Sequence, residues 1–368
     1  MKTVGILTFH YVDNYGAVLQ TYALRHVINN LPGYSADIIN YIPPTFSYNK
    51  HWKTQMENNL FLRKRKYFTD FLYKKCGIKE SLVSFLTGEE YDYFCVGSDQ
   101  IWNTSFKGLI YFLPFQSDTS QKISYAASVG LSEESPFFNW EYFRKYIPDF
   151  SWISVREQEH VKLLESVTDV SCECVLDPVL LLDASDYENI IEKKKLREHE
   201  FIFFFWLPHD GSLFRGIEFT NMLSRKYNLP VVHSVINSES YMFYNDDGCM
   251  MFEGVGNFLW YIKNASYVVT NSYHATLFSI QYNKVFWSMV VHSMRSRFDS
   301  LVRTLGIGER IIKTYLPYDK IDKTIDYKKI YKKIDKERVK SMDYLYKALS
   351  IKKDKESILE EDNETVWR

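Results

Sequence analysis

Residues 5–24 read GILTFHYVDNYGAVLQTYAL, and this stretch is the most informative about the fold class. The short apolar run at 4–9 predicts a buried strand, and the apolar residues of 17–28 recur at the spacing of one helix face. A polar loop that ends in Gly16 joins the two. Strand, loop and helix in this order form the repeating unit of parallel α/β proteins. The segment therefore predicts an α/β fold.

The same alternation continues along the chain in two series. We predict further strands at 35–41, 93–96, 122–127, 152–155 and 175–182, and then at 201–206, 230–235, 267–270 and 285–291. A highly charged stretch at 183–200 separates the series. We therefore expect an N-terminal Rossmann-like domain at 1–185, a C-terminal one at 200–310, and a basic helical region with a tail at 311–368.

Composition narrows the class of protein. The 368 residues include 45 Lys and Arg against 46 Asp and Glu, a net charge of -1, so we expect no nucleic-acid partner. A hydrophobic share of 46% excludes wholesale disorder. The densest apolar run, 201–207, is too short to cross a membrane. Aromatic residues make up 17%, which suits either bulky cores or sugar-facing surfaces.

The ends and the cysteines point to an intracellular setting. The apolar run at the N-terminus is shorter than that of a secretory leader and is followed by polar and aromatic residues. Five cysteines with no repeated CxxC spacing predict neither a disulfide framework nor a zinc site. We expect a cytoplasmic protein without a metal.

Ligands of doubly wound sheets collect where strands end and helices begin, and two such junctions are rich in polar groups. In the first, Asn14, Tyr15 and Gly16 precede a helix, and Gly16 would let a ligand approach the backbone N–H groups. The alternative is that Asn14 only caps the helix. In the second, Asn271 and Ser272 follow a strand, with Tyr273 and His274 in the next helical turn. His274 is there either a catalyst or a satisfied structural histidine.

Further polar residues end other predicted strands. Ser98 and Asp99 follow 93–96, and Arg156 follows 152–155. Arg156 suits bidentate binding of a carboxylate or phosphate, but an exposed ion pair is the alternative. For Asp177, before Pro178, we favour simple capping of a turn. Arg295 and Arg297 add two cations after the last predicted strand.

Common nucleotide and hydrolase signatures are missing from the chain. Gly254 and Gly256 begin a G-x-G pattern that lacks its third glycine, so NAD binding has little support. The sequence contains no Walker A motif, no H-E-x-x-H and no G-x-S-x-G.

Taken in order, the polar segments resemble one known family. The matching pieces are GILTFHYVDNYGAVLQTYAL (5–24), VGSDQIWN (96–103), KISYAASVG (122–130), ISVRE (153–157), VLDPVLLL (175–182) and VVTNSYHATLFSI (268–280). Together they are similar to the polysaccharide pyruvyl transferase family. The resemblance implies a GT-B-like fold, with two Rossmann-like domains facing across a cleft. It also implies transfer of the enolpyruvyl group of phosphoenolpyruvate onto a sugar as a cyclic ketal, in surface or capsular polysaccharide biosynthesis, with phosphoenolpyruvate as donor substrate and no cofactor.

The resemblance also implies roles for individual residues. The family's motif histidine falls on His274, as general acid/base, and the arginine of its V-R motif falls on Arg156, as donor ligand. Many members have Arg-Leu where this chain has Ser272 and Tyr273, so one expected cation is missing. Either the helix N-terminus with Asn271 and Ser272 takes its place, or Arg295 or Arg297 reaches in.

We also predict which residues form the acceptor side of the cleft. Asn14, Tyr15, Gly16 and Ser98 would shape it, with Asp99 as a possible hydroxyl base. Tyr11, Tyr15, Trp102 and Tyr273 are candidates for stacking on the sugar. We expect a polyprenyl-linked oligosaccharide acceptor, and peripheral contact of the basic 310–355 region with the cytoplasmic face of the membrane. The alternatives are a glycosyltransferase that uses a nucleotide-sugar on the same fold and a non-catalytic carbohydrate-binding subunit.

Overall fold

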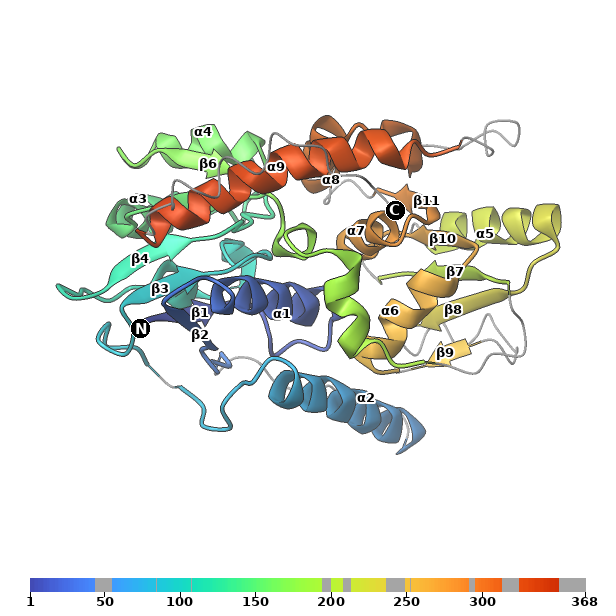
Figure 1. The fold of residues 1–368 in the computed structure, drawn as a ribbon, viewed down its shortest axis with the longest axis horizontal. Helices are drawn as coiled ribbons and strands as arrows, with labels where there is room; N and C mark the ends of the chain where they lie inside the picture. The colour runs from blue at the N-terminus through green and yellow to red at the C-terminus, as the bar shows by residue number, and fades with distance from the viewer. Residues whose placement is uncertain are drawn as a thin grey trace.

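The structure is a computed structural model. It describes residues 1–43, 55–83, 85–106, 108–193, 200–207, 213–235, 249–251, 253–290, 295–312 and 324–350. Figure 1 shows two α/β halves side by side, each built on a parallel sheet.

The first half contains strands β1 (Lys2–Leu7), β2 (Tyr34–Ile38), β3 (Tyr93–Val96) and β4 (Gln121–Ser124), all parallel in the order β2-β1-β3-β4. Strands β5 (Ile153–Val155) and β6 (Cys172–Cys174) pair with each other, and isolated bridges link Ile123 to Trp152 and Ala127 to Val155. Its helices are α1 (Tyr15–Asn29), α2 (Gln55–Lys74), α3 (Trp140–Tyr146) and α4 (Glu159–Glu165).

The second half holds six parallel strands: β7 (Ile202–Phe205), β8 (Val231–Val235), β9 (Cys249–Met251), β10 (Tyr267–Thr270), β11 (Val285–Met289) and β12 (Ile311–Ile312). Their order is β12-β11-β10-β7-β8-β9, the strand order of a Rossmann fold. The helices are α5 (Leu213–Tyr227), α6 (Val255–Asn264), α7 (Tyr273–Gln281) and α8 (Arg295–Leu305). The predicted class, α/β with two Rossmann-like domains, is confirmed.

One predicted strand is wrong. Residues 175–182 do not form it; β6 ends at Cys174, and a 3₁₀ turn, η4, follows at Pro178–Leu180. Pro178 cannot donate to a strand ladder and suits the first position of a helical turn, which explains the early end. The short strands β9 and β12 were not predicted.

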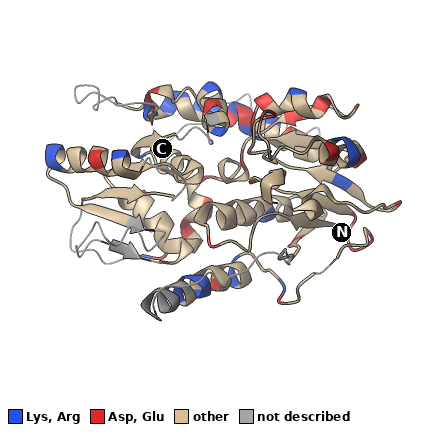
Figure 2. Cartoon of the chain, turned by 180° about the vertical axis from the view of Figure 1, so that it is seen from behind, with Lys and Arg blue, Asp and Glu red and all other residues tan. Residues whose placement is uncertain are grey.

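Helix α9 (Tyr327–Ala348) lies in the region predicted to be basic and helical, and it returns to the first half (Figure 1). The predicted tail lies outside the described residues. The Tyr344 hydroxyl donates to the Ser124 carbonyl at 2.7 Å, and the Leu176 amide donates to Ser341 Oγ at 2.9 Å. Figure 2 shows Lys and Arg in blue and Asp and Glu in red along the chain. Basic residues outnumber acidic ones along α9, as predicted for this region. One of these cations, Arg338, binds the Leu180 carbonyl at 3.0 Å, so part of the basic charge fastens the helix to the fold.

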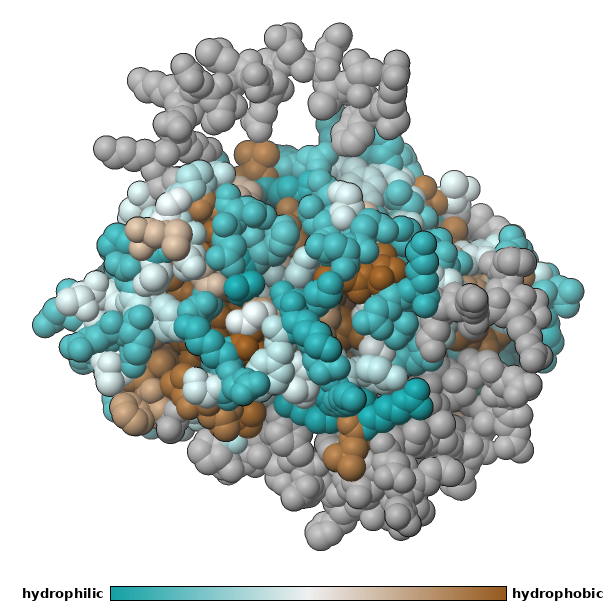
Figure 3. Space-filling model, turned by 60° about the horizontal axis from the view of Figure 1, so that its bottom comes forward, coloured by the Kyte–Doolittle hydropathy of each residue, from teal (hydrophilic) through white to brown (hydrophobic). Residues whose placement is uncertain are grey.

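Core packing accounts for most of the aromatic surplus. The run Phe201–Trp206 is buried throughout; Phe203 stacks on Tyr261 of α6, and Phe205 packs edge-to-face on Phe258. The face shown in Figure 3 is mainly hydrophilic, with hydrophobic residues in separate small patches. Within the described residues, no helix is both long and apolar enough to span a bilayer.

Candidate active site

The candidate site lies where the carboxyl ends of the two sheets meet. In an open parallel sheet, ligands bind at the point where the strand order reverses. That point lies between β1 and β3 in the first half and between β7 and β10 in the second. Asn271 closes the second switch point, because its side chain accepts from the Leu207 amide at 2.7 Å and donates to the Leu207 carbonyl at 2.8 Å.

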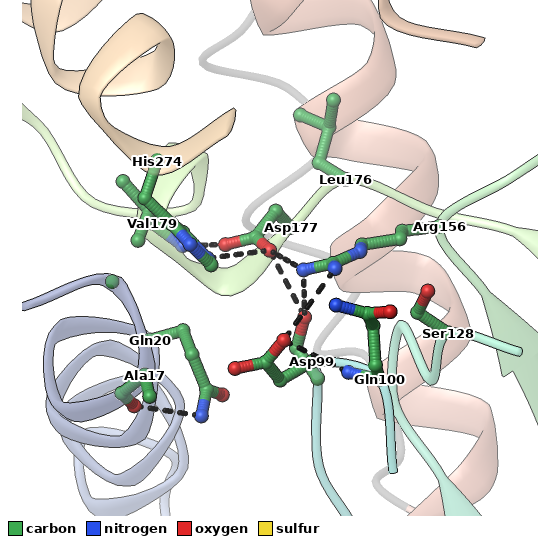
Figure 4. A network of polar contacts seen from close by, with 12 residues as sticks. Ala17, Gln20, Asp99, Gln100, Ser128, Arg156, Leu176, Asp177, Val179 and His274 are labelled. Carbon is green, nitrogen blue, oxygen red and sulfur yellow. Dashed lines mark hydrogen bonds and ion pairs between the residues drawn. The ribbon is translucent and has the colours of Figure 1, made fainter. Parts of the chain in front are cut away.

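Asp177 is the centre of the site, although the sequence favoured only a capping role for it. It does cap η4, by accepting from the Val179 amide at 3.1 Å. Its other oxygen accepts from Ser98 Oγ at 2.9 Å and from Arg156 Nη1 at 2.9 Å (Figure 4). The same oxygen lies 3.4 Å from His274 Nε2. Four parts of the chain thus converge on one fully buried carboxylate.

The charge of Asp177 is stabilised by these partners. Burial alone would raise the pKa of this carboxyl group, because a charge in the interior is costly. His274, 3.4 Å away, and then the charge of Arg156 act the other way and hold the pKa of Asp177 well below its ordinary value. Asp177 is therefore ionised throughout the working pH range.

Arg156 is buried among carboxylates rather than forming an exposed ion pair. Its Nε donates to Glu157 at 3.1 Å and its Nη1 to Asp177 and Ser98. The guanidinium lies over the Tyr273 ring, 4.8 Å from the centroid. Only Nη2 lacks a hydrogen bond among the described residues, with the Asp99 carboxylate 3.7 Å away. Arg156 thus has one buried N–H edge without an acceptor in the described part of the chain.

His274 lies in the first turn of α7, against α1 of the other half. A methyl group at Gly16 would come within 2.1 Å of His274 Nδ1 and 2.5 Å of Cγ. A glycine is therefore required at position 16 to make room for the imidazole. Because Asp177 faces Nε2, it favours the tautomer that carries the proton there, which leaves the Nδ1 lone pair to exchange protons.

The loop before α1 is more self-contained than the sequence suggested. Asn14 caps the helix by accepting from the Gly16 amide at 2.9 Å and the Ala17 amide at 3.4 Å. His274 fills the space beside Gly16. The prediction that a ligand approaches these N–H groups is therefore wrong. Ser272 likewise caps α7, by accepting from the Ala275 amide at 3.3 Å.

Asp99 occupies a strained position at the end of β3. Its φ of 82° is in the left-handed region that non-glycine residues seldom adopt. Its Oδ1 accepts from the Gln100 amide at 2.8 Å, and its side chain remains 14% exposed at the site. Strain of this kind persists where the surroundings enforce it, often at functional sites.

The rings predicted to stack on a sugar are mostly inside the protein. Trp102 is fully buried, and Tyr15 stacks on Phe258 at 4.5 Å with its hydroxyl on the Glu253 carbonyl at 2.8 Å. Tyr11 and Tyr273 are each 7% exposed. The prediction of open stacking rings is wrong for Trp102 and Tyr15, because their faces are already covered by core residues.

Of the two candidate cations in α8, the structure describes the side chain of Arg297 only. The side chain of Arg295 lies outside the described residues. Arg297 is only 7% exposed, and its Nε has no hydrogen-bond partner among the described residues. Burial lowers the pKa of Arg297, and the charge of nearby Arg156 lowers it further.

A second buried network, which the sequence did not indicate, adjoins the first. Glu157 accepts from Ser128 Oγ at 2.7 Å and from Arg156, and lies 3.4 Å from His160 Nδ1. The other nitrogen of His160 contacts the Leu131 carbonyl at 3.3 Å. The described residues contain no cluster of His, Cys, Asp and Glu side chains that could hold a metal ion.

Solved structures share this architecture. A co-structure of S. aureus MnaA with UDP has a TM-score of 0.55 and 14% identity, covering 96% of this chain and 99% of that one. A UDP-N-acetylglucosamine 2-epimerase gives 0.54 and 13%, over 96% and 97%. A putative UDP-N-acetylglucosamine 2-epimerase from Listeria monocytogenes gives 0.51 and 10%, over 92% and 90%. At such identities the likeness shows the fold alone, which is GT-B-like.

Sequence comparison identifies the family. No curated protein matches the chain. The family model named polysaccharide pyruvyl transferase matches residues 14–293, well over half of the 368 residues. This range contains Asp99, Arg156, Asp177 and His274. The chain belongs to the polysaccharide pyruvyl transferase family.

Proposed function

We propose that this protein transfers the enolpyruvyl group of phosphoenolpyruvate to a sugar and closes it as a cyclic pyruvate ketal. The observation that supports this reading best is the buried set of Asp177, Arg156 and His274 at the meeting strand ends. It combines a proton-exchanging imidazole with a guanidinium edge, which are the groups that an anionic enol donor needs.

The reaction requires two C–O bonds and one proton transfer to carbon. Two sugar hydroxyls add to C2 of phosphoenolpyruvate, and the bond from C2 to the phosphate oxygen breaks. One hydroxyl proton ends on the methylene carbon, which becomes a methyl group, and the other leaves with inorganic phosphate. A general acid and a general base must therefore work on opposite parts of the donor.

We assign these roles to two residues. His274 exchanges its proton through Nδ1, because Asp177 orients Nε2. Asp99, partly exposed and held in a strained backbone, accepts the hydroxyl proton of the sugar. Arg156 Nη2 binds an anionic oxygen of the donor. As acceptor we propose a lipid-linked oligosaccharide precursor; contact of α9 with a membrane stays a prediction.

The test is phosphate release from phosphoenolpyruvate in the presence of a panel of lipid-linked sugars. General acid–base help is worth about 10²- to 10⁴-fold, so His274→Ala should lower turnover by that factor. Its unfolding midpoint in urea should fall, because the buried Asp177 loses a partner, so turnover is compared per folded molecule. His26→Ala, in the last turn of α1, is the matched control and should keep full turnover. Near-normal turnover of His274→Ala would remove His274 from the role.

A second candidate function is transfer from a nucleotide-sugar. The observation that favours it is the shared fold with enzymes whose names include UDP or UDP-N-acetylglucosamine. Binding assays with UDP-sugars, added to the same panel, separate the candidates. Binding of a UDP-sugar without release of phosphate from phosphoenolpyruvate would support the second, whereas sugar binding without any turnover would indicate a non-catalytic carbohydrate-binding subunit.

A further inference from the structure

Two buried guanidinium nitrogens at the site have no hydrogen-bond partner within the described residues. They are Nη2 of Arg156, at the end of β5, and Nε of Arg297, in the first turn of α8. Arg156 is 4% exposed and Arg297 7%. Burying an N–H donor of a charged group without an acceptor is costly, so a native protein seldom keeps two at one place without a reason.

The two arginines belong to neighbouring, mutually anchored elements. The Ser300 hydroxyl of α8 donates to the Arg156 carbonyl at 3.3 Å and accepts from the Gln158 amide at 3.2 Å. In the same helix, Phe298 packs edge-to-face on Tyr273, the ring that carries the Arg156 guanidinium. These contacts fix α8 against Arg156 and Tyr273, close enough that the charge of Arg156 acts on Arg297.

Carboxylates surround the two arginines, but none within the described ranges accepts a hydrogen bond from Arg156 Nη2 or Arg297 Nε. Asp177 is paired with Arg156 and His274, and Glu157 is shared between Arg156 and His160. Asp99 lies 3.7 Å from Arg156 Nη2, too far for a hydrogen bond. The charges of Glu157 and Asp99 favour the protonated form of Arg297, but neither carboxylate accepts a hydrogen bond from its Nε.

From this arrangement we infer that Arg156 Nη2 and Arg297 Nε together bind one anionic oxygen group of the donor, its phosphate or its carboxylate. Arg297 thereby supplies the cation that the chain lacks at Ser272. The identity of the donor rests on the proposed function, but the existence of the anion site does not. Two guanidinium groups with free N–H donors form the arrangement that recognises phosphate and carboxylate best.

Removing the Arg297 guanidinium should raise the stability of the ligand-free protein and weaken its binding of the donor. Arg297→Met replaces an unpaired buried cation with an apolar chain of similar length, so the ligand-free protein should unfold at a higher temperature than the wild type. The same variant should bind phosphoenolpyruvate about 10- to 100-fold more weakly, which corresponds to the loss of one charge-assisted hydrogen bond. A residue with a merely structural role would not separate the two effects in this way.

Calorimetry and thermal unfolding test the anion site. The probes are phosphoenolpyruvate, inorganic phosphate and pyruvate. Weakened binding of phosphate alone would place the phosphate at Arg297, and weakened binding of pyruvate alone would place the carboxylate there; either supports the inference. Arg303→Gln removes an exposed cation from the same helix and should leave all three affinities unchanged. Arg297→Lys keeps the charge without Nε and should bind phosphoenolpyruvate with intermediate affinity.

Unchanged affinity of Arg297→Met for all three probes would overturn the inference, and so would a lower unfolding temperature of its ligand-free form. Failure of the wild type to bind any of them would do the same. If the wild type binds phosphoenolpyruvate through Arg297 but no sugar is pyruvylated, the proposed function fails while the anion site stands. The two failures are therefore distinguishable.

Discussion

The two carboxylates that hold Arg156 have nearly the same partners but different surroundings. Asp177 and Glu157 are both fully buried, and each accepts from a serine hydroxyl, from Arg156 and faces a histidine. On the Asp177 side, His274 faces the other half of the protein across Gly16. On the Glu157 side, His160 has both ring nitrogens occupied, the second by the Leu131 carbonyl.

This difference shows that the set of residue types does not by itself make a catalytic histidine. An imidazole with two partners holds the fold together, whereas one with a single partner can still exchange a proton. We therefore expect the Asp177 side to control turnover and the Glu157 side to control stability. Variants of matched size on the two sides test this division of roles.

The largest effect is expected for Asp177→Asn. It leaves Arg156 with less counter-charge in the interior, and breaking a buried ion pair from one side costs about 3–5 kcal/mol of unfolding free energy. Turnover should also fall by about 10²- to 10⁴-fold, because His274 loses the group that orients it. Urea unfolding and phosphate release measure the two losses.

Glu157→Gln is the matched variant for this prediction. We expect a comparable loss of stability, because Glu157 also pairs with Arg156 in the interior. Turnover per folded molecule should fall much less than in Asp177→Asn. Equal losses of turnover in the two variants would contradict the division of roles.

The strand ends could be predicted from the sequence better than the contacts between them. Local apolar runs bounded by polar residues place β3 and β10 at the predicted positions, and with them Asp99 and His274. The sequence underestimates Asp177, because the apolar residues around it predict a strand and the Asp-Pro pair predicts only a cap. Its real partners come from the ends of β3 and β5 and from the start of α7, and such long-range contacts leave no local pattern.

Burial of individual rings was equally hard to predict. Tyr15 follows a polar loop and precedes a glycine, which suggested an open position. The ring instead lies between the halves, stacked on Phe258 of α6. Whether a side chain at a strand end faces solvent or the other domain depends on how the domains pack, and no stretch of twenty residues contains that information.

A smaller effect is expected for Gly16→Ala, which tests the contact across the halves. The added methyl group would overlap the His274 ring, so the ring or the helix must shift. A misplacement of about 1 Å can cost about 10²-fold in rate. Phosphate release by the purified variant measures the loss.

The double variant Gly16→Ala with His274→Ala separates this overlap from a general effect on the helix. Removing the imidazole removes the clash, so Gly16→Ala should lower turnover no further in that background. It should even stabilise the fold slightly, because alanine suits a helix better than glycine. A further loss of turnover would show that Gly16 acts by some route other than making room for His274.

The smallest effect, on the order of 1 kcal/mol, is expected from the titration of His160. Burial would lower the pKa of this imidazole, but the hydrogen bond and charge of Glu157 outweigh burial and raise it above its ordinary value of 6.5. The folded state therefore binds the proton more tightly than the unfolded state does. The resulting stability is fully present below about pH 6.5 and is lost as the pH rises through the raised pKa.

His160→Gln should flatten this part of the urea-stability profile without changing turnover, since His160 touches no proposed substrate group. If the wild-type profile stays flat between pH 6 and 9, the Glu157 side does not hold a charged histidine, and its difference from the Asp177 side must come from geometry alone.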